Sequence, residues 1–401
     1  MSGPLSGVKI VDLTGMVSGP LATMTLADQG ADVIKVEAPG GDHTRHASRG
    51  RGGFSASFLN NNRNKRSIVL DLKNPSGHEA FLRLAAGADV VAQNFRPGVA
   101  TRIGVGEVEI RAINPSVIYV SIAGFGFSGP YAQKPVFDPL IQAVSGLTTV
   151  QGGSDEERPK LVRTILPDKL TGIQAAQAIS AALFARERSG EGQHVQLSML
   201  DTLVSFLWSS DMGAHTFVGD EMESERAHSF IDLIYETRDG FVSVAVQQDK
   251  DWHGLARAVD RPDLIDDERF RSPQLRERHK NDRLEVTQSV INPFTTDEIL
   301  ARLEAQDVPC APVLTRSAMR THPQVVANGT IIEAPHPVAG KLRQARHPAV
   351  FSQTQCKVPA GAPGLGENTA EILAEAGFSE NEISDLTSSG AAVQAPDKEG
   401  A

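Results

Sequence analysis

The 401-residue chain is poor in cysteine, in aromatic residues and in positive charge. Its two cysteines are too few for a disulfide scaffold or a thiolate zinc site, so we expect reduced thiols in a cytoplasmic protein. The sequence has no run of 18 apolar residues, and its first residues lack the basic and apolar parts of a secretory signal. The net charge of -10 argues against nucleic acid or an anionic membrane as the main partner.

The length and the histidine pattern bound the architecture further. A chain of 401 residues exceeds the usual single hydrophobic core, so two domains are expected. The 11 histidines include no HExxH pair. His43 and His46 lie in a glycine-rich stretch that is typical of a solvated loop, so no metal site is expected.

The first part of the chain alternates short β-branched runs with helical patterns. This alternation predicts a parallel α/β sheet. The expected strands are 8–13, 33–36, 67–72, 90–93 and 117–122, and the expected helices are 20–29 and 75–86. A further strand at 162–166 and a long alanine-rich helix at 168–186 are expected to follow.

The pattern changes in the second half. Residues 206–228 have no clean period and are interpreted as a linker. A small α/β unit follows at 229–324, with a strand at 241–246 and a helix that begins at a capping box formed by Thr295 and Glu298. A short helix is expected at 368–376, and the tail from 391 to 401 lacks bulky apolar residues except Val393, so we expect it to be disordered.

The segment Gly124–Gly129 fits the GxGxxG dinucleotide fingerprint and follows an expected strand. However, Pro130 and Tyr131 come next, so no helix begins in the register that the fingerprint requires. A dinucleotide oxidoreductase is therefore disfavoured. A glycine loop that lets the backbone approach another group closely is the preferred interpretation.

The run Asn62-Arg-Asn-Lys-Arg66 is the one dense cationic run early in the chain. It is interpreted either as a solvated loop or as a contact to a phosphate or pyrophosphate group. Arginine would offer a planar fork to such a group, and lysine a point charge.

Asp168 lies at the start of the alanine-rich helix, directly after Pro167. It is expected to be the N-cap, which accepts hydrogen bonds from the first free amides. A role as nucleophile is compatible with this position, because the positive end of a helix dipole favours an ionised carboxylate.

A series of short motifs covers most of the chain. The series comprises Leu5–Leu13, Ser18–Pro20, Leu26–Glu37, Pro39–Asp42, Asn62–Ser67, Leu70–Lys73, Asn94-Phe95, Pro97-Gly98, Ile113–Pro115, Gly126–Tyr131, Gly190–Asp201 and Val308–Val313. In this order the motifs resemble the class III CoA-transferases, a family that includes formyl-CoA transferase and carnitine CoA-transferase. The resemblance extends over about residues 5–386.

The resemblance implies a fold and a reaction. The fold is a Rossmann-like large domain with a parallel sheet, built from residues 1–205 and 325–390, plus a small α/β domain, and the subunits form an interlocked homodimer. The reaction moves CoA from a donor acyl-CoA to a small carboxylic acid through an aspartyl anhydride and an aspartyl-CoA thioester. Coenzyme A and acyl-CoA would be substrates, with no permanently bound cofactor, and succinyl-CoA is a common donor in the family.

The resemblance also assigns site residues. Asp168 matches the family's catalytic aspartate. The positions that contact CoA in the family correspond to Val17, Ser18, Leu70, Lys73, Asn94, Phe95 and Arg102, with Lys134 where the family often has arginine. Lys73 and Arg102 would lie near phosphates.

Two departures from the family bear on the alternatives. Phe137 stands where related racemases have a histidine, so an acyl-CoA racemase or isomerase of the same fold would lack one of its two acid/base groups. Residues 223–232 lack the run of glycines that closes over the reacting carbonyl in formyl-CoA transferase. A non-catalytic CoA-binding protein is the remaining alternative.

Overall fold

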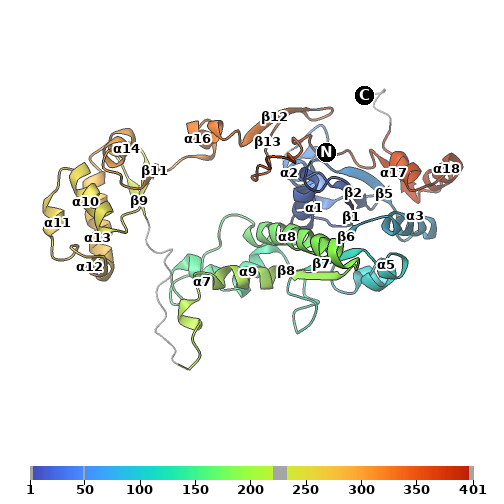
Figure 1. Cartoon of the computed structure of the whole chain (residues 1–401), viewed down its shortest axis with the longest axis horizontal. Coiled ribbons are helices and arrows are strands. Elements are labelled where there is room, and N and C mark those ends of the chain that lie inside the picture. The colour runs from blue at the N-terminus through green and yellow to red at the C-terminus, as the bar shows by residue number, and fades with distance from the viewer. Residues whose placement is uncertain (1–2, 48–49, 220–232, 397–401) are drawn as a thin grey trace. The chain divides into compact units, whose positions relative to one another are not determined.

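A computed structural model of the chain describes residues 3–47, 50–219 and 233–396 (Figure 1). The contacts divide the chain into two compact units. Unit 1 comprises residues 1–152, 158–221 and 327–401, and unit 2 comprises residues 153–157 and 222–326. The expected linker at 206–228 lies outside the described residues from 220 onward, as does the whole of segment 223–232.

Unit 1 is built on a seven-stranded sheet with the order β14-β5-β2-β1-β6-β7-β8. Every neighbouring pair is parallel except β14 with β5. The strands are β1 (Lys9–Asp12), β2 (Asp32–Glu37), β5 (Arg66–Leu70), β6 (Val90–Gln93), β7 (Ile118–Ala123), β8 (His194–Ser198) and β14 (Ala392–Val393). The predicted parallel α/β sheet is therefore confirmed.

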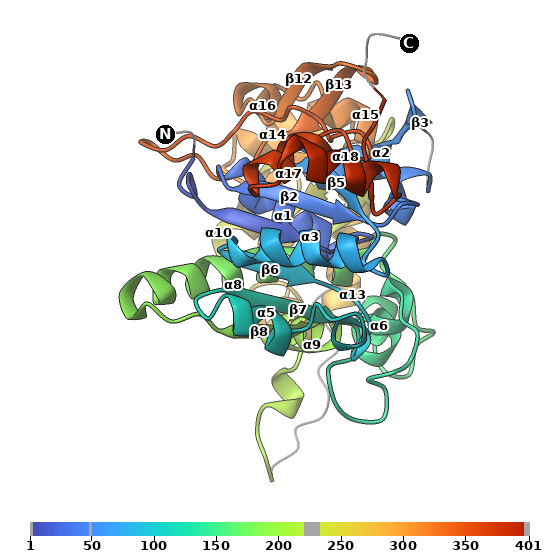
Figure 2. The same cartoon turned by 90° about the vertical axis from the view of Figure 1, so that its right-hand side faces the viewer.

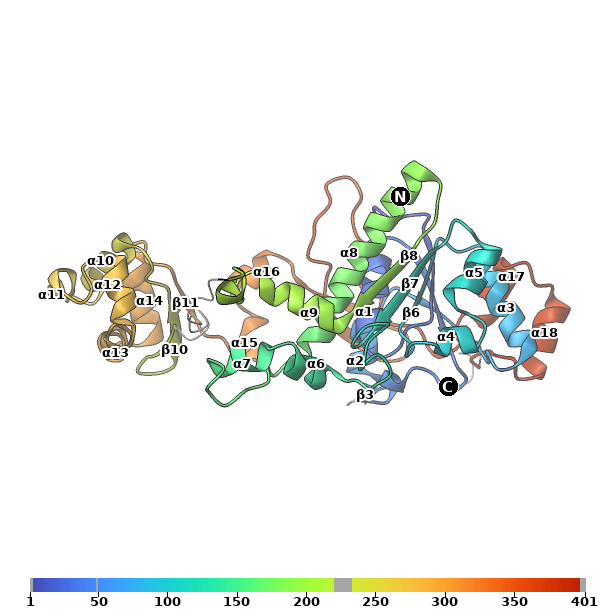
Figure 3. The same ribbon diagram turned by 90° about the horizontal axis from the view of Figure 1, so that it is seen from below.

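Helices cover both faces of this sheet, because neighbouring residues of each buried strand point to opposite sides. Ile10 faces α1 (Ser18–Asp28) and α8 (Leu166–Ser189) in one apolar cluster. Val11 belongs to the other cluster, with side chains of α3 (Pro75–Ala86), α5 (Glu107–Ile113), α17 (Thr369–Glu375) and α18 (Glu380–Ser388). Figure 3 shows these two layers on either side of the sheet. Figure 2 shows the second layer from its outer side, with α3, α17 and α18 in front of the strands.

Shorter elements complete unit 1. They are η1 (His43–Arg45), β3 (Gly50–Arg51), β4 (Phe54–Ser55), α2 (Ala56–Asn62), α4 (Val99–Arg102), α6 (Asp138–Val144), α7 (Leu147–Gly152), α9 (Met199–Trp208), η2 (Gly213–His215), β12 (Ile331–His336) and β13 (Gly340–Ala345). The short helix α16 (Pro323–Ala327) spans the boundary between the units. Of the described residues, no helix is both long and apolar enough to cross a membrane.

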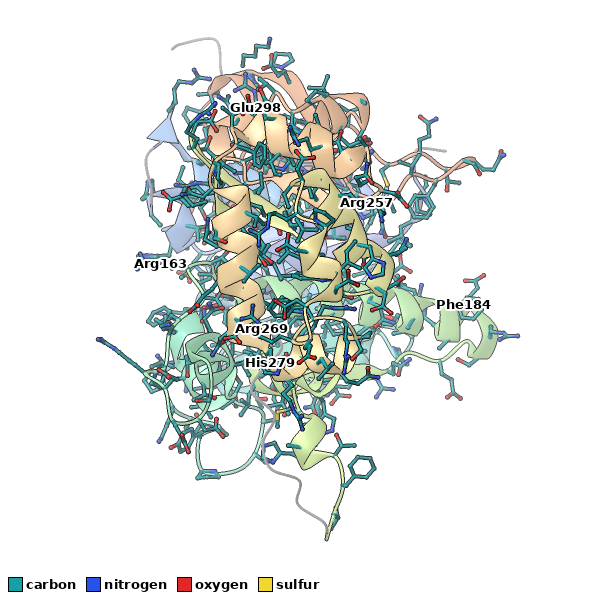
Figure 4. All side chains as sticks on the ribbon, turned by 90° about the vertical axis from the view of Figure 1, so that its left-hand side faces the viewer. Arg163, Phe184, Arg257, Arg269, His279 and Glu298 are labelled. Carbon is teal, nitrogen blue, oxygen red and sulfur yellow. The ribbon has the colours of Figure 1, made fainter. Side chains whose placement is uncertain are left out.

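Unit 2 combines a small antiparallel sheet with helices. The sheet has the order β11-β10-β9, and Trp252 and Phe270 pack in its core. The strands are β9 (Ile234–Glu236), β10 (Phe241–Val244) and β11 (Cys310–Pro312), and the helices are α10 (Asp249–Ala258), α11 (Asp263–Asp266), α12 (Pro273–Arg278), α13 (Lys280–Ile291), α14 (Thr296–Glu304) and α15 (Arg316–Met319). Arg269 and His279, labelled in Figure 4, both approach Asp282, at 3.6 Å each. The predicted capping box of Thr295 and Glu298 is present at the start of α14.

Two local predictions were wrong. No strand forms at 162–166, because the amide of Val162 donates to the side chain of Gln142 (3.0 Å) and α8 already begins at Leu166. The first residues of the expected disordered tail are ordered, since Ala392 pairs with Leu70 in β5 and is buried. The small side chains of β14 fit at the edge of the sheet, and backbone hydrogen bonds hold the strand, so a rule based on bulky apolar residues does not detect it. Residues 397–401 lie outside the described part of the chain.

Candidate active site

A pocket of about 410 Å³ opens at the carboxyl ends of the central strands of unit 1. It lies where the strand order reverses, because the chain runs from β1 outward to β2 and β5 and then returns to β6 on the other side. Open parallel sheets bind ligands at this reversal. The walls are the turns that follow the four strands, including Leu13–Met16, Ala38, Gly41–His43, Leu70–Lys73, Asn94 and Phe95.

Four of the residues assigned to CoA contact line this one pocket, namely Leu70, Lys73, Asn94 and Phe95. Asn94 joins two of the walls, because its Nδ2 donates to the carbonyl of Gly15 (2.7 Å) and its Oδ1 accepts from the Gly15 amide (2.8 Å). The Lys73 side chain is exposed, as a contact to a solvated phosphate requires. Contact with CoA itself stays a prediction.

Other residues assigned to CoA contact do not line this pocket. Val17 is buried as the residue that precedes α1, and Arg102 is exposed at the end of α4. The ammonium group of Lys134 lies 3.2 Å from the ring centroid of Tyr131, which is an exposed cation–π contact.

Asp168 is the third residue of α8, and Ile165 occupies the N-cap position without a side-chain bond. The prediction of an N-cap role was therefore wrong, because Pro167 fits inside the first helical turn and lets the helix begin earlier. The Asp168 carboxyl group instead lies near the backbone amide and the hydroxyl group of Ser18, at the start of α1, and both groups act to lower its pKa.

A glycine brings these two helices together. A Cβ atom added at Gly172, one turn after Asp168, would lie 2.7 Å from the Ser18 carbonyl oxygen and 3.0 Å from Leu21 Cβ. Any side chain at this position would push α1 away from α8. The glycine thus permits the close approach that puts Ser18 against Asp168.

The surroundings of Asp168 raise its pKa to about 6. Burial is the largest cause, and the nearby Asp138 carboxyl group is the next, while the bonds from Ser18 act in the opposite direction. Asp138 is 3% exposed, accepts from the Asp168 amide (3.3 Å) and accepts from Gln142 Nε2 (2.7 Å). The sequence argument named only the helix dipole and missed the larger, opposing effects of burial and like charge.

The cationic run at 62–66 serves the fold. Arg63 pairs with Asp28 at 2.6 Å and Lys65 with Asp12 at 2.9 Å, and all four side chains are buried. Arg66 opens β5 and bonds Asp32 together with two glutamates of α17. Both interpretations offered for this run, a solvated loop and a phosphate contact, were wrong for these cations, because each one is engaged by a carboxylate.

Sequence reasoning also missed functional neighbours. A lysine at 35 between the apolar residues of β2 was a usable signal, since a buried ammonium group requires a partner. Nothing in the sequence marked Asp138 as a neighbour of Asp168, because they are 30 residues apart and on different helices. Within the described residues, no group of three or more His, Cys, Asp and Glu side chains is placed to hold a metal.

The glycine loop after β7 confirms the argument against a dinucleotide fingerprint. The strand ends at Ala123 and the next helix, α6, begins only at Asp138. Phe137, which precedes that helix, is 67% exposed.

Comparison with known proteins decides the family. The profile described as CoA-transferase family III matches residues 5–369. This chain belongs to that family. As a family III CoA-transferase, it transfers CoA between an acyl-CoA and a carboxylate.

Named relatives of this CoA-transferase span nearly its whole length. It is 34% identical to succinate–glutarate CoA-transferase of Agrobacterium fabrum, over 93% of this chain and 95% of the relative. It is 32% identical to formyl-CoA:oxalate CoA-transferase of Escherichia coli, over 96% of this chain and 98% of the relative. The crystal structure of a CAIB/BAIF family protein from Brucella suis superposes with a TM-score of 0.83 at 33% identity, over 94% of this chain and 100% of that one.

Proposed function

We propose that Asp168 is the covalent nucleophile of the transfer. The observation that carries the proposal is its pairing with Ser18, because Ser18 follows Met16, which lines the pocket, by only two residues. Two residues span at most about 8 Å, so a thioester at that end of the pocket lies within reach of the carboxyl group.

The electrostatics of Asp168 suit this role. With a pKa of about 6, the carboxyl group is roughly nine-tenths ionised at pH 7, yet it is more basic than an ordinary aspartate. Acylation removes its negative charge and with it the repulsion from Asp138. The charged ground state is therefore disfavoured relative to the acylated enzyme.

The steps balance without a redox partner. The Asp168 carboxylate attacks the thioester carbonyl of the donor, forms a mixed anhydride and releases CoA thiolate. The thiolate attacks the aspartyl carbonyl, which gives an aspartyl-CoA thioester and frees the donor acid. The acceptor carboxylate attacks this thioester, and the released thiolate then attacks the acceptor carbonyl of the second anhydride, which regenerates Asp168.

Ser18 supplies donors for the charge that develops in two of these steps. Each attack on the aspartyl carbonyl places negative charge on an oxygen of Asp168, and the nearby Ser18 amide and hydroxyl are the donors that we assign to this charge. Donors fixed in advance at such an oxygen lower the barrier. Coenzyme A is a substrate in this scheme, and its pantetheine and phosphate groups are assigned to Leu70, Phe95 and Lys73.

We propose that at least one of the two exchanged acids is a small dicarboxylic acid, with succinyl-CoA as the first donor to test. The support is the substrates named for two relatives, succinate with glutarate and formyl-CoA with oxalate.

The decisive experiment is the intact mass of the enzyme after incubation with a panel of acyl-CoAs, followed by hydroxylamine. A hydroxamate localised to Asp168, and absent from Asp168→Ala, supports the mechanism and identifies the donor. Absence of any modification, with uptake of solvent deuterium at the α-carbon of an acyl-CoA, would establish an isomerase instead.

We also propose that the enzyme acts as a homodimer. Ile173 and Phe184 on α8 are 59% and 64% exposed, and Figure 4 shows Phe184 on the outer part of the helix. Exposed apolar side chains on one helix mark an interaction surface. Sedimentation of wild-type enzyme and Phe184→Asp tests this, since a monomeric wild type would contradict it.

A further inference from the structure

A buried ion pair lies in the wall of the pocket, at a distance from the reacting carboxyl group. Lys35 of β2 and Asp42 of the following turn are in contact at 2.9 Å, and their side chains are 1% and 2% exposed. Both residues line the pocket. Removing two charges from water costs free energy unless hydrogen bonds to other groups compensate for the lost solvation. The hydrogen-bond partners of Lys35 and Asp42 therefore indicate which part of the fold the pair stabilises.

Both members of the pair bond the turn that connects the pocket to Ser18. The Lys35 ammonium group donates to the carbonyl of Thr14 (2.8 Å). Asp42 Oδ1 accepts from the Met16 amide (3.4 Å), while its Oδ2 accepts from Lys35 (2.9 Å). The pair therefore fixes the backbone of residues 14 and 16, which precede α1.

This turn needs external restraint. Met16 has a φ of +68°, a left-handed conformation that a residue with a long side chain adopts only under constraint. Further bonds come from Asn94, which holds Gly15, and from buried Lys65, which donates to Pro20 (3.0 Å). Residues 14–16 and 20 are thus held by side chains from other parts of the sheet, and Ser18 lies between them.

We propose that the Lys35–Asp42 ion pair is a positioning pair for the transfer reaction, which holds the 14–18 turn so that Ser18 stays packed against α8 with its amide and hydroxyl beside Asp168. The inference rests on the proposed role of Asp168. It adds that the pocket wall and the nucleophile are structurally coupled, because Lys35 and Asp42 line the pocket and also position Ser18 beside the Asp168 carboxyl group.

The test compares wild-type enzyme with Asp42→Asn, which keeps the shape of the side chain but removes the charge opposite Lys35. A looser turn weakens the bonds from Ser18 that lower the pKa of Asp168. The low-pH fall in kcat should then move upward by about half a pH unit, and kcat at pH 7 should fall about tenfold, with KM for the donor within about threefold. The charged group that faces Asp168 from α6, Asp138, is unchanged in the variant, as is the exposed neighbour Lys169 on α8 itself.

Asp28→Asn is the matched control. It disrupts another buried ion pair, with Arg63, at the end of α1 opposite to the turn. It should lower the melting temperature as Asp42→Asn does, but leave the pH profile in place. An equal shift in both variants would reduce the Lys35–Asp42 pair to a structural role and overturn the inference.

A milder variant covers the case in which Asp42→Asn does not fold. Thr44→Val removes the hydroxyl group that donates to Asp42 Oδ1 (2.8 Å) and leaves the charges intact. It should shift the pH profile in the same direction by a smaller amount, and a folded Thr44→Val with an unchanged profile would contradict the inference. Failure of hydroxylamine labelling at Asp168 in the wild type would refute the proposed function first, and would remove the inference with it.

Discussion

The raised pKa of Asp168 has a measurable consequence for stability. We consider Asp168→Asn, which replaces the carboxylate by a neutral group of the same shape. The side-chain amide still offers a polar oxygen to the nearby Ser18 amide and hydroxyl, so the variant removes the charge and keeps the polar surroundings. The variant should lose transfer activity and yet be more stable than the wild type at neutral pH.

The sign and size follow from the two pKa values. Asp168 has a pKa of about 6 in the folded enzyme, against 3.8 for an ordinary aspartate. The fold thus favours the protonated form, and this contribution is fully present below about pH 3.8 and is lost as the pH rises through 6. Two units correspond to about 3 kcal/mol. Because the carboxyl group is only partly buried, we expect the gain at pH 7.5 to be on the order of 1 to 3 kcal/mol.

The assay is urea unfolding of both proteins at pH 7.5 and at pH 4.5. The gain in unfolding free energy should shrink to about a third at pH 4.5, where the wild-type carboxyl group is largely protonated in the fold. Asp263→Asn is the control, because Arg261 holds the pKa of that exposed carboxyl below its usual range and no gain is expected. A gain that does not change with pH, or no gain at all, would refute the assignment of a raised pKa.

Three further results are expected. Ser18→Ala should lower kcat about tenfold and move the low-pH fall in kcat upward, because one of the bonds that lower the pKa of Asp168 is lost; a pH–rate profile checks this. Lys73→Ala should raise KM for acyl-CoA about tenfold with kcat within about twofold, as measured by steady-state kinetics. Arg63→Met should cost about 3 to 5 kcal/mol of unfolding free energy in urea, because it leaves Asp28 buried without its partner, while KM stays unchanged.

Regular elements with local signals were predictable from the sequence. Helix α3 runs over Pro75–Ala86 as expected, because Asn74 caps it, proline occupies its first turn and Gly87 ends it. Strand β6 matches its expected range, 90–93, since a short buried apolar run in a parallel sheet is bounded on both sides by turn residues. The pocket residues Asn94 and Leu70 were assigned from the family resemblance, and the structure brings them together because strand ends meet at one edge of the sheet.

The remaining features depend on contacts between distant segments. The partner of Arg63 is Asp28, which no local pattern predicts. The pKa of Asp168 depends on Asp138, on another helix, and its bonds depend on the close packing that Gly172 permits. Such features are set by tertiary packing, which the periodicity of the sequence does not encode.

The pairing of β14 with β5 has a consequence for the order of synthesis. Ala392 pairs with Leu70, so the edge of the sheet is completed 322 residues after its partner strand (392 − 70). At a translation rate of 5 to 20 residues per second, this delay amounts to roughly 16 to 64 s. During that interval the free edge of β5 remains open to pairing with other chains, while unit 2 emerges with all of its own strands. The β5 edge of a nascent chain is therefore expected to be more open to pairing with other chains than the same edge in the finished protein.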